Sequence, residues 1–357
     1  MEFTMSGRHE VRITTDDVGK RVSVRSLTDP GERAGRFTDT VGVLTSWTRG
    51  VVQITRRDGE TVRIPATRLV AAKVVPPTPA RRRGLPAAGY RELALVAARG
   101  WPAVESERLG DWTLRASGGF TRRANSVLPL GDPGLPLDAA LEHVTAWYAR
   151  RGLPAYLQVA TGAEGTDEAL AAALDERGWG REVSAEVRIA GLAPVADAAQ
   201  EMHAAHAGTA AGHAAAQGPE AAVVLSRTVD AGWLARYRRS REAPPEVTSV
   251  LGGGPSVWFA TVPGEGEPAA VGRCVVDGRW AGFAAVEVDP ARRREGLATA
   301  VMAALARRAL AEGASAAYLQ VESDNGPALA LYERLGFAAH HRYHHYRHGH
   351  HDPAPQG

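Results

Sequence analysis

The sequence DPARRREGLA, residues 289–298, follows an apolar run over 281–288 and precedes a helical pattern that continues to about residue 311. Gly296 and the small Ala298 allow a sharp turn and leave the first N–H groups of the helix open toward a ligand. Arginine side chains beside such a turn add charge-assisted hydrogen bonds to phosphate oxygens. The stretch therefore predicts a strand-loop-helix unit that binds a pyrophosphate. The alternative is an ordinary helix start with a solvated basic turn.

A second stretch, ESDNGPALALYERLGF over residues 322–337, follows the apolar run 317–321. The two stretches together resemble the Gcn5-related N-acetyltransferase (GNAT) superfamily, whose cofactor loop reads Arg/Gln-x-x-Gly-x-Gly/Ala and whose second signature reads Asn-x-x-Ala-x-x-Leu-Tyr-x-x-x-Gly-Phe. The residues that fill these patterns are Arg293, Gly296 and Ala298 in the first and Asn325, Ala328, Leu331, Tyr332, Gly336 and Phe337 in the second. Two ordered matches are specific, so we expect the acetyltransferase fold in this part of the chain.

The resemblance implies a site for acetyl-CoA (coenzyme A) and no metal site. In the superfamily the strand that ends here at Val288 separates from the strand that ends at Val321, and the pantetheine arm pairs with the exposed backbone of the former. Asn325 would bond the pantetheine backbone, or would serve only as the N-cap of its helix. The cofactor-binding residues that the resemblance implies are Val286, Val288, Arg293, Arg294, Gly296, Leu297, Ala298, Thr299, Asn325, Ala328 and Tyr332.

Tyr332 and Glu287 are the predicted catalytic residues. The resemblance implies that Tyr332 stands near the thioester sulfur, where its hydroxyl can protonate the leaving thiolate; its alternative role is an aromatic anchor of the helix on the sheet. Glu287 is a candidate for the base that deprotonates the amine, or for a substrate anchor. Members of the superfamily usually place a base where this chain has Gly282 and Ala284, so water relays are the alternative.

A repeat indicates how the chain is organised. The tetrapeptide Tyr-Leu-Gln-Val occurs at 156–159 and again at 318–321, each time between two helical stretches. Residues 88 to about 347 are therefore interpreted as two diverged copies of one strand-helix-strand-helix unit, with a boundary near Pro194. The first copy lacks both the Arg-x-x-Gly-x-Ala loop and the Asn signature, so we expect one cofactor site per chain, in the second copy.

The first copy, residues 88–192, is expected to keep the fold without the cofactor loop. It is either a packing partner or one wall of the cleft that receives the acceptor. A wall of this kind would deepen the site, which favours a small-molecule amine over a protein amine. The candidate wall residues are Trp101, Trp112, Phe120, Arg122, Arg123, Asn125 and Ser126.

The N-terminal part of the chain has a different pattern. Residues 10–75 alternate apolar and polar side chains in about five short runs, with an Asp-Gly hairpin signal at 58–59, which predicts a small SH3-like β-barrel. The Pro- and Arg-rich stretch 76–87 predicts a linker. The expected fold class is α/β (α+β), with two tandem GNAT-like mixed sheets flanked by helices over 88–192 and 193–347, preceded by the barrel.

Composition excludes several classes of partner. The chain has 357 residues, with 42 Lys and Arg against 40 Asp and Glu, for a formal net charge of +2. This balance supports neither nucleic acid nor an anionic membrane as a partner. The sequence has no long apolar run, residues 1–20 lack the apolar centre of a signal peptide, and Cys274 is the only cysteine, so we expect a cytoplasmic protein. Cys274 itself is expected to be a core residue.

Seven of the twelve histidines lie near the C-terminus, namely His340, His341, His344, His345, His348, His350 and His351. They predict a last strand over 342–347 followed by a solvated His-rich tail over 348–357, with adventitious metal binding as the alternative.

The residues and the resemblance together predict an acetyl-CoA-dependent N-acetyltransferase in which an amine attacks the thioester directly. A small-molecule amine is the favoured acceptor, and a protein amine is the other candidate. The alternative is a non-catalytic acyl-CoA-binding or partner-recruiting protein. The presence of both Asn325 and Tyr332 argues against this alternative, because cofactor binding alone would not require the acid.

Overall fold

A computed structural model of the chain describes residues 11–28, 37–56, 60–75, 84–207, 223–237 and 243–349. The expected turn at 58–59, most of the expected linker and the tail from residue 350 lie outside these residues. The chain divides into two compact units, Met1–Ala80 with Leu310–Gly313, and Arg81–Ala309 with Ala314–Gly357.

The N-terminal unit contains a five-stranded antiparallel sheet in the order β4-β3-β2-β1-β5. Its strands are β1 (Arg21–Leu27), β2 (Phe37–Thr48), β3 (Val51–Thr55), β4 (Thr61–Pro65) and β5 (Leu69–Val74). Along β1 every second side chain is buried, as the alternating sequence predicts. The core of this unit contains Val22, Val24, Leu44, Val52 and Ile54. The antiparallel sheet is confirmed, and its closure into a barrel stays a prediction.

Apart from Leu310–Gly313, the second unit contains residues 88–347, which the sequence predicts to be two copies of a repeat. The elements of its first half are α1 (Tyr90–Gly100), β6 (Glu105–Leu109), β7 (Trp112–Ala116), β8 (Leu128–Pro129), α2 (Leu137–Ala149), β9 (Tyr156–Thr161), α3 (Glu168–Glu176) and β10 (Trp179–Gly191). The elements of its second half are α4 (Leu192–Ala207), β11 (Val224–Ser226), α5 (Ala231–Arg236), α6 (Pro245–Gly252), β12 (Val257–Val262), β13 (Ala270–Asp277), β14 (Trp280–Val288), α7 (Leu297–Ala311), β15 (Ala316–Glu322), α8 (Gly326–Arg334) and β16 (Ala338–His348). Pro194, the expected boundary, lies in the first turn of α4.

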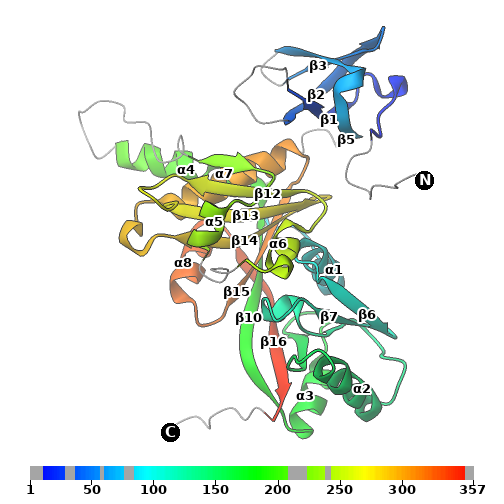
Figure 1. Ribbon diagram of the computed structural model, residues 1–357. Coiled ribbons are helices and arrows are strands. Elements are labelled where there is room, and N and C mark those ends of the chain that lie inside the picture. Colours follow the sequence, from blue (N-terminus) through cyan, green and yellow to red (C-terminus); the bar gives the residue numbers. More distant parts are fainter. Residues whose placement is uncertain are drawn as a thin grey trace. The chain divides into compact units, whose positions relative to one another are not determined.

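The strands of the two halves share one sheet. We expected two mixed sheets, and the structure instead has an eight-stranded sheet in the order β11-β12-β13-β14-β15-β10-β16-β9 and a three-stranded sheet β6-β7-β8. The last strand of the first half, β10, pairs antiparallel with both β15 and β16 (Figure 1). The last strand of the second half, β16, pairs in turn with β9. Each half thus contributes its last strand to the pairing of the other half. The alternation of apolar and polar residues could not predict this exchange, because it shows which face of a strand is buried and not which strands are its neighbours.

The apolar runs of the second half form the centre of this sheet. Cys274 on β13 is buried and free, as expected. Helix α7 begins at Leu297, directly after Gly296, and its apolar side chains pack on the sheet. Among the described residues, no helix is long and apolar enough to cross a membrane.

Candidate active site

The parallel strands β14 and β15 pair over only part of their length. Their pairing runs from Trp280 opposite Ala316 to Phe283 opposite Leu319, although both strands continue well beyond this point. Past Phe283, the β15-facing side of the β14 backbone has no strand partner within the described part of the chain. This is the separation that the GNAT resemblance implies, and it leaves backbone groups available for an extended ligand.

A β-bulge follows directly in β14. Ala284 pairs with Arg273 and Glu287 pairs with Val271, so two residues of β14 face the single Gly272 of β13, and Ala285 has a φ of 54°. Because Arg273 and Val271 are two positions apart, their partners Ala284 and Glu287 point to the same face of the sheet. The bulge therefore brings Glu287 to the face on which superfamily members usually carry their base, which strand alternation alone would not have predicted.

Helix α8 holds Tyr332 beside the separated strands. The helix starts at its predicted N-cap, where Oδ1 of Asn325 accepts a hydrogen bond from the Ala328 N–H at 3.2 Å. The Tyr332 ring lies edge-on to Phe337 with a centroid distance of 5.9 Å, and Phe337 lies edge-on to Phe283 at 6.3 Å. Burial, and then the nearby Glu287 carboxylate, raise the pKa of Tyr332 to about 12. Tyr332 is thus an aromatic anchor whose hydroxyl keeps its proton at neutral pH.

The loop before α7 has the geometry of an anion cradle. Gly296 has a φ of 80° and accepts the N–H of Ala300 at 3.0 Å, so the N–H groups of Leu297, Ala298 and Thr299 are the free donors of the first turn. The start of the loop is fixed, because Asp289 pairs with Arg236 at 2.9 Å. These features fit a pyrophosphate.

The three arginines of this loop differ in their partners. Arg292 is engaged with Glu295 at 2.6 Å. Arg293 and Arg294 are exposed and have no ion-pair partner among the residues that the structure describes. The two unpaired guanidinium groups are therefore available to an anion, as the sequence predicts for Arg293 and Arg294.

A cleft of about 640 Å³ opens where β14 and β15 separate. The predicted site residues that line it are Val286, Glu287, Asn325, Ala328 and Tyr332. The remaining predicted cofactor residues belong to the end of β14, the loop and the start of α7, outside the lining of the cleft, and these are Val288, Arg293, Arg294, Gly296, Leu297, Ala298 and Thr299.

The first half of the unit forms the facing wall of the cleft. Of the candidate wall residues, Phe120, Arg122, Arg123 and Asn125 line the cleft. The other three lie elsewhere, namely Trp101, Trp112 and Ser126. Trp112 is buried in the core beside α2, and the hydroxyl of Ser126 accepts a hydrogen bond from Arg115. Trp101 supports the wall from behind, because its indole N–H donates to Thr121 Oγ1 at 2.9 Å.

Asn125 holds the wall loop in shape. Its Oδ1 accepts the backbone N–H groups of Ser117 and Gly119, and its Nδ2 donates to the carbonyls of Phe120 and Thr121. Thr121 has a φ of 57°, which is strained for a β-branched residue, so the loop depends on this network. Asn125 is thus a positioning residue that presents the two arginines following Thr121.

Several cleft residues were not predicted from the sequence. They come from strands β9, β10, β15 and β16 and are Tyr156, Val183, Ala185, Gln320, Glu322, Tyr343 and His345. The repeated Tyr-Leu-Gln-Val contains two of them, Tyr156 and Gln320, and this repeat was the one available signal. Tyr156 donates a hydrogen bond to Glu182 at 2.8 Å, and Glu182 also binds Arg122 at 2.6 Å.

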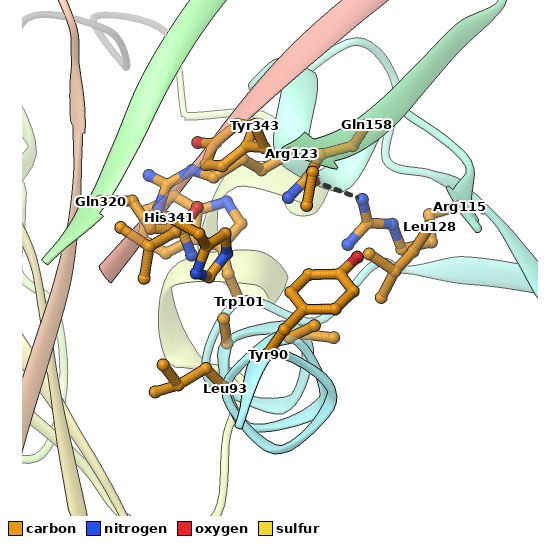
Figure 2. A pocket seen from close by; sticks show the side chains of 15 residues that line it. Tyr90, Leu93, Trp101, Arg115, Arg123, Leu128, Gln158, Gln320, His341 and Tyr343 are labelled. Atoms are coloured by element: carbon orange, nitrogen blue, oxygen red, sulfur yellow. Dashed lines mark hydrogen bonds between the residues drawn. The ribbon is translucent and has the colours of Figure 1, made fainter. Parts of the chain in front are cut away.

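A small enclosed pocket of about 20 Å³ lies behind the cleft and shares Arg123, Gln320 and Tyr343 with it. Figure 2 shows Tyr90 of α1 and the buried Arg115 of β7 facing each other across this pocket. Arg115 donates to Gln158 Oε1 at 2.8 Å and has no carboxylate partner among the described residues. Burial lowers the pKa of Arg115 to about 10, so it remains a cation behind the cleft at neutral pH.

The predicted last strand is confirmed as β16, and three of its histidines are buried. The ring nitrogens of His344 lie within hydrogen-bond distance of the hydroxyls of Ser184 at 2.7 Å and Thr161 at 3.0 Å. His345 is 3% exposed and lines the cleft, a position in the site that the sequence did not predict. No group of three His, Cys, Asp or Glu suited to a metal occurs within the described ranges.

Comparisons with known proteins agree with this geometry. A family model described as "Probable histone acetyltransferase Rv0428c C-terminal" matches residues 87–346. The "Probable histone acetyltransferase Rv0428c" of Mycobacterium tuberculosis is 34% identical over 142 residues, which are 40% of this chain and 44% of that protein. The match thus spans less than half of that relative. The "Uncharacterized N-acetyltransferase YobR" of Bacillus subtilis is 27% identical over 285 residues, 72% of this chain and 97% of that protein.

Among solved structures, a "GCN5-related N-acetyltransferase from Kribbella flavida" is 16% identical, with a TM-score of 0.49, and covers 72% of this chain and 95% of that chain. The family match extends over well more than half of the chain and includes the residues that line the cleft, the loop before α7 and α8. The chain therefore belongs to this family of GNAT-type N-acetyltransferases.

Proposed function

We propose that this protein transfers the acetyl group of acetyl-CoA to an amine in the cleft beside β14 and α8. The observation that carries the proposal is that Tyr332 and Glu287, from different elements, line one cleft at the point where β14 and β15 separate. A protein that only binds an acyl-CoA would need neither a proton-holding hydroxyl nor a carboxylate there.

The residues present fit acetyl-CoA. In this proposal the free N–H groups of Leu297, Ala298 and Thr299, with Arg293 and Arg294, hold the pyrophosphate. The unpaired backbone of Val286 and Val288 receives the pantetheine arm, and Asn325 and Ala328 flank it. When bound, acetyl-CoA supplies an acetyl group that is activated as a thioester.

Two side chains then move the protons. Glu287 takes the proton that the acceptor ammonium must lose before it can attack. Tyr332 Oη gives its proton to the sulfur that departs. As the new N–C bond replaces the C–S bond, the nitrogen gives its second surplus proton to the Tyr332 phenolate. The products are the neutral amide and the free thiol of CoA, and Glu287 returns its proton to solvent.

The same proposal includes the domain assignment, with residues 88–192 as a unit without a cofactor loop and 193–347 as the catalytic unit. The order α2-β9-α3-β10 in the first half and α7-β15-α8-β16 in the second supports a common origin of the two units.

The acceptor in this proposal is a small-molecule amine, because the wall from the first half encloses the cleft. A protein lysine is the second candidate, and the name of the Mycobacterium tuberculosis relative favours it. The test is the release of free thiol from acetyl-CoA with a panel of small amines and, separately, with lysine-containing peptides. Glu287→Gln should lower the rate with a reactive amine by ~10²-fold or more, and Glu142→Gln, at an exposed glutamate of α2 outside the cleft, is the matched control. An absence of thiol release with every amine would contradict the proposal.

A further inference from the structure

The cleft carries charges of opposite sign on its two walls. Glu287 of β14, which lies beside Tyr332, and Glu322 of β15 line the cleft from the second half, whereas Arg122 and Arg123 project from the loop of the first half. Arg122 is neutralised by Glu182. Arg123 has no carboxylate partner among the described residues, and the cation of Arg115 lies behind the same wall. The wall of the first half is therefore positive on balance.

Arg123 is held in place by an aromatic ring. Its guanidinium lies over the ring of Trp101 at 4.7 Å from the centroid, and the Asn125 network fixes the backbone of its loop. A planar guanidinium that is stacked on one face keeps its N–H edge free for a planar anion. Because Arg123 lines the cleft, an anion that binds this edge would lie in the cleft.

His345 of β16 provides an independent observation in the same cleft. It is buried, it lines the cleft, and neither ring nitrogen has a hydrogen-bond partner within the described part of the chain. A buried imidazole without partners is costly, because each polar atom loses its bonds to water. The rings of Tyr156 and Tyr343 lie edge-on to the imidazole. The N–H and the unprotonated ring nitrogen of His345 are therefore available to a polar ligand.

We infer that Arg123 and His345 form a subsite for a carboxylate of the acceptor, so that the acceptor is an amino acid-like compound with a separate amine and carboxylate. This inference rests on the proposed function for the fate of the amine. The ammonium faces Glu287, and the carboxylate accepts hydrogen bonds from the Arg123 guanidinium and one His345 N–H. One guanidinium and one imidazole suit a singly charged carboxylate rather than a phosphate dianion. A basic peptide would be repelled by this wall.

The experiment compares ω-amino acids of increasing chain length with n-alkylamines of the same length as acceptors in the thiol-release assay. At the best length, the amino acid should have a kcat/KM at least about ten-fold higher than the alkylamine. Calorimetry with the matching N-acetyl amino acid and N-alkylacetamide should show the same preference in affinity without any turnover.

Variants assign the preference to its residues. Arg123→Met and His345→Phe should each remove most of the preference in both measurements, and Arg123→Lys should keep part of it, because it retains the charge without the fork. The matched controls are Arg151→Met, whose guanidinium also lies over a tryptophan ring but outside the cleft, and His344→Asn, the neighbouring histidine that binds Ser184 and Thr161. Both controls should retain the preference.

The outcomes separate the two proposals. If alkylamines and amino acids are acetylated equally well, the proposed function stands and the carboxylate subsite is refuted. A preference that survives Arg123→Met also refutes the subsite. If no amine releases thiol, the proposed function fails, and the calorimetric preference still decides whether the subsite exists.

Discussion

The ring of Tyr318 on β15 lies against the backbone of Gly282 on β14, so that a β-carbon at residue 282 would collide with the Tyr318 hydroxyl and its ring carbon. The hydroxyl points back toward α1 and donates to the Val96 carbonyl at 3.4 Å. Position 282 is one of the two where superfamily members usually place a base. Tyr318 thus explains why this chain has glycine there, and it leaves Glu287 as the carboxylate of that strand.

Substitution of Gly282 should therefore act mainly on the stability of the fold, because the added side chain meets Tyr318. We expect Gly282→Ala to lower the free energy of unfolding by about 1–3 kcal/mol, because the added carbon overpacks against a ring that cannot move. Urea denaturation measures this change. In a Tyr318→Leu background, which removes the colliding atoms, the same substitution should cost clearly less; equal costs in both backgrounds would disprove the collision.

Tyr332→Phe separates the acid from the anchor, because it keeps the ring on Phe337 and removes only the hydroxyl. If Tyr332 protonates the departing thiolate, the single-turnover rate should fall by ~10²-fold or more, with little change in CoA affinity or melting temperature. Rapid-quench measurement of acetyl transfer is needed, because slow product release would hide the effect in the steady state. A wild-type single-turnover rate would leave Tyr332 as an anchor only.

The cofactor loop is tested by the two neighbouring arginines with different partners. Arg293→Ala should weaken CoA binding by roughly 10-fold or more, since it removes a charge-assisted hydrogen bond. Arg292→Ala is the control, because Glu295 already engages that guanidinium. Calorimetry with CoA and with acetyl-pantetheine, which lacks the pyrophosphate, completes the test. An equal loss of affinity for both ligands would contradict a contact with the pyrophosphate.

The number of cofactor sites is a separate prediction. The segment before α2 has none of the arginines of the loop before α7, and Asp138 places a carboxylate in the first turn of α2, where it disfavours an anion. Each chain should therefore bind one CoA. Calorimetric titration of a known concentration of active protein gives the ratio, and two equivalent sites would show that the first half has kept a working loop.

Acid should destabilise the fold through the histidines of β16. Burial, with the charges of neighbouring residues, lowers the pKa of His341 and His344 to about 4 and holds that of His345 well below 6.5. In the unfolded chain they take up protons near their ordinary value, so the stability they provide is complete above that value and is lost as the pH falls toward 4. Each histidine contributes a slope of about 1.4 kcal/mol per pH unit within that window.

Urea denaturation at a series of pH values measures this slope. His344→Asn should reduce the slope of the unfolding free energy against pH by the contribution of one proton, about 1.4 kcal/mol per pH unit. A stability that is flat through the window would rule out the neutral buried state of these side chains.

Local sequence was sufficient for the parts of the site that are contiguous in the chain. The loop at 289–298, the N-cap Asn325 and the helix that carries Tyr332 are each formed by neighbouring residues with a strong turn or capping preference. For the same reason the strands of the N-terminal unit could be placed from their alternation. These parts needed no knowledge of which strands become neighbours.

The remaining parts of the site depend on pairing between distant strands. His345 and Tyr343 reach the cleft because β16 pairs with β9 and β10, and nothing in the sequence of β16 specifies those partners. Glu287 reaches its face because of a single bulge at Ala285, where no glycine marks the positive φ. A bulge of one residue reverses the face of every side chain beyond it, so alternation fails there.

The exchange of last strands also limits how this chain can change. Because β10 completes the sheet of the second half and β16 completes that of the first, neither half presents a finished module that recombination could transfer to another protein. A substitution on β16 affects the pairing with β9 of the first half, and a substitution on β10 affects the pairing with β15 of the second half. New acceptor preferences must therefore arise by coordinated point changes on both halves rather than by the acquisition of a different domain.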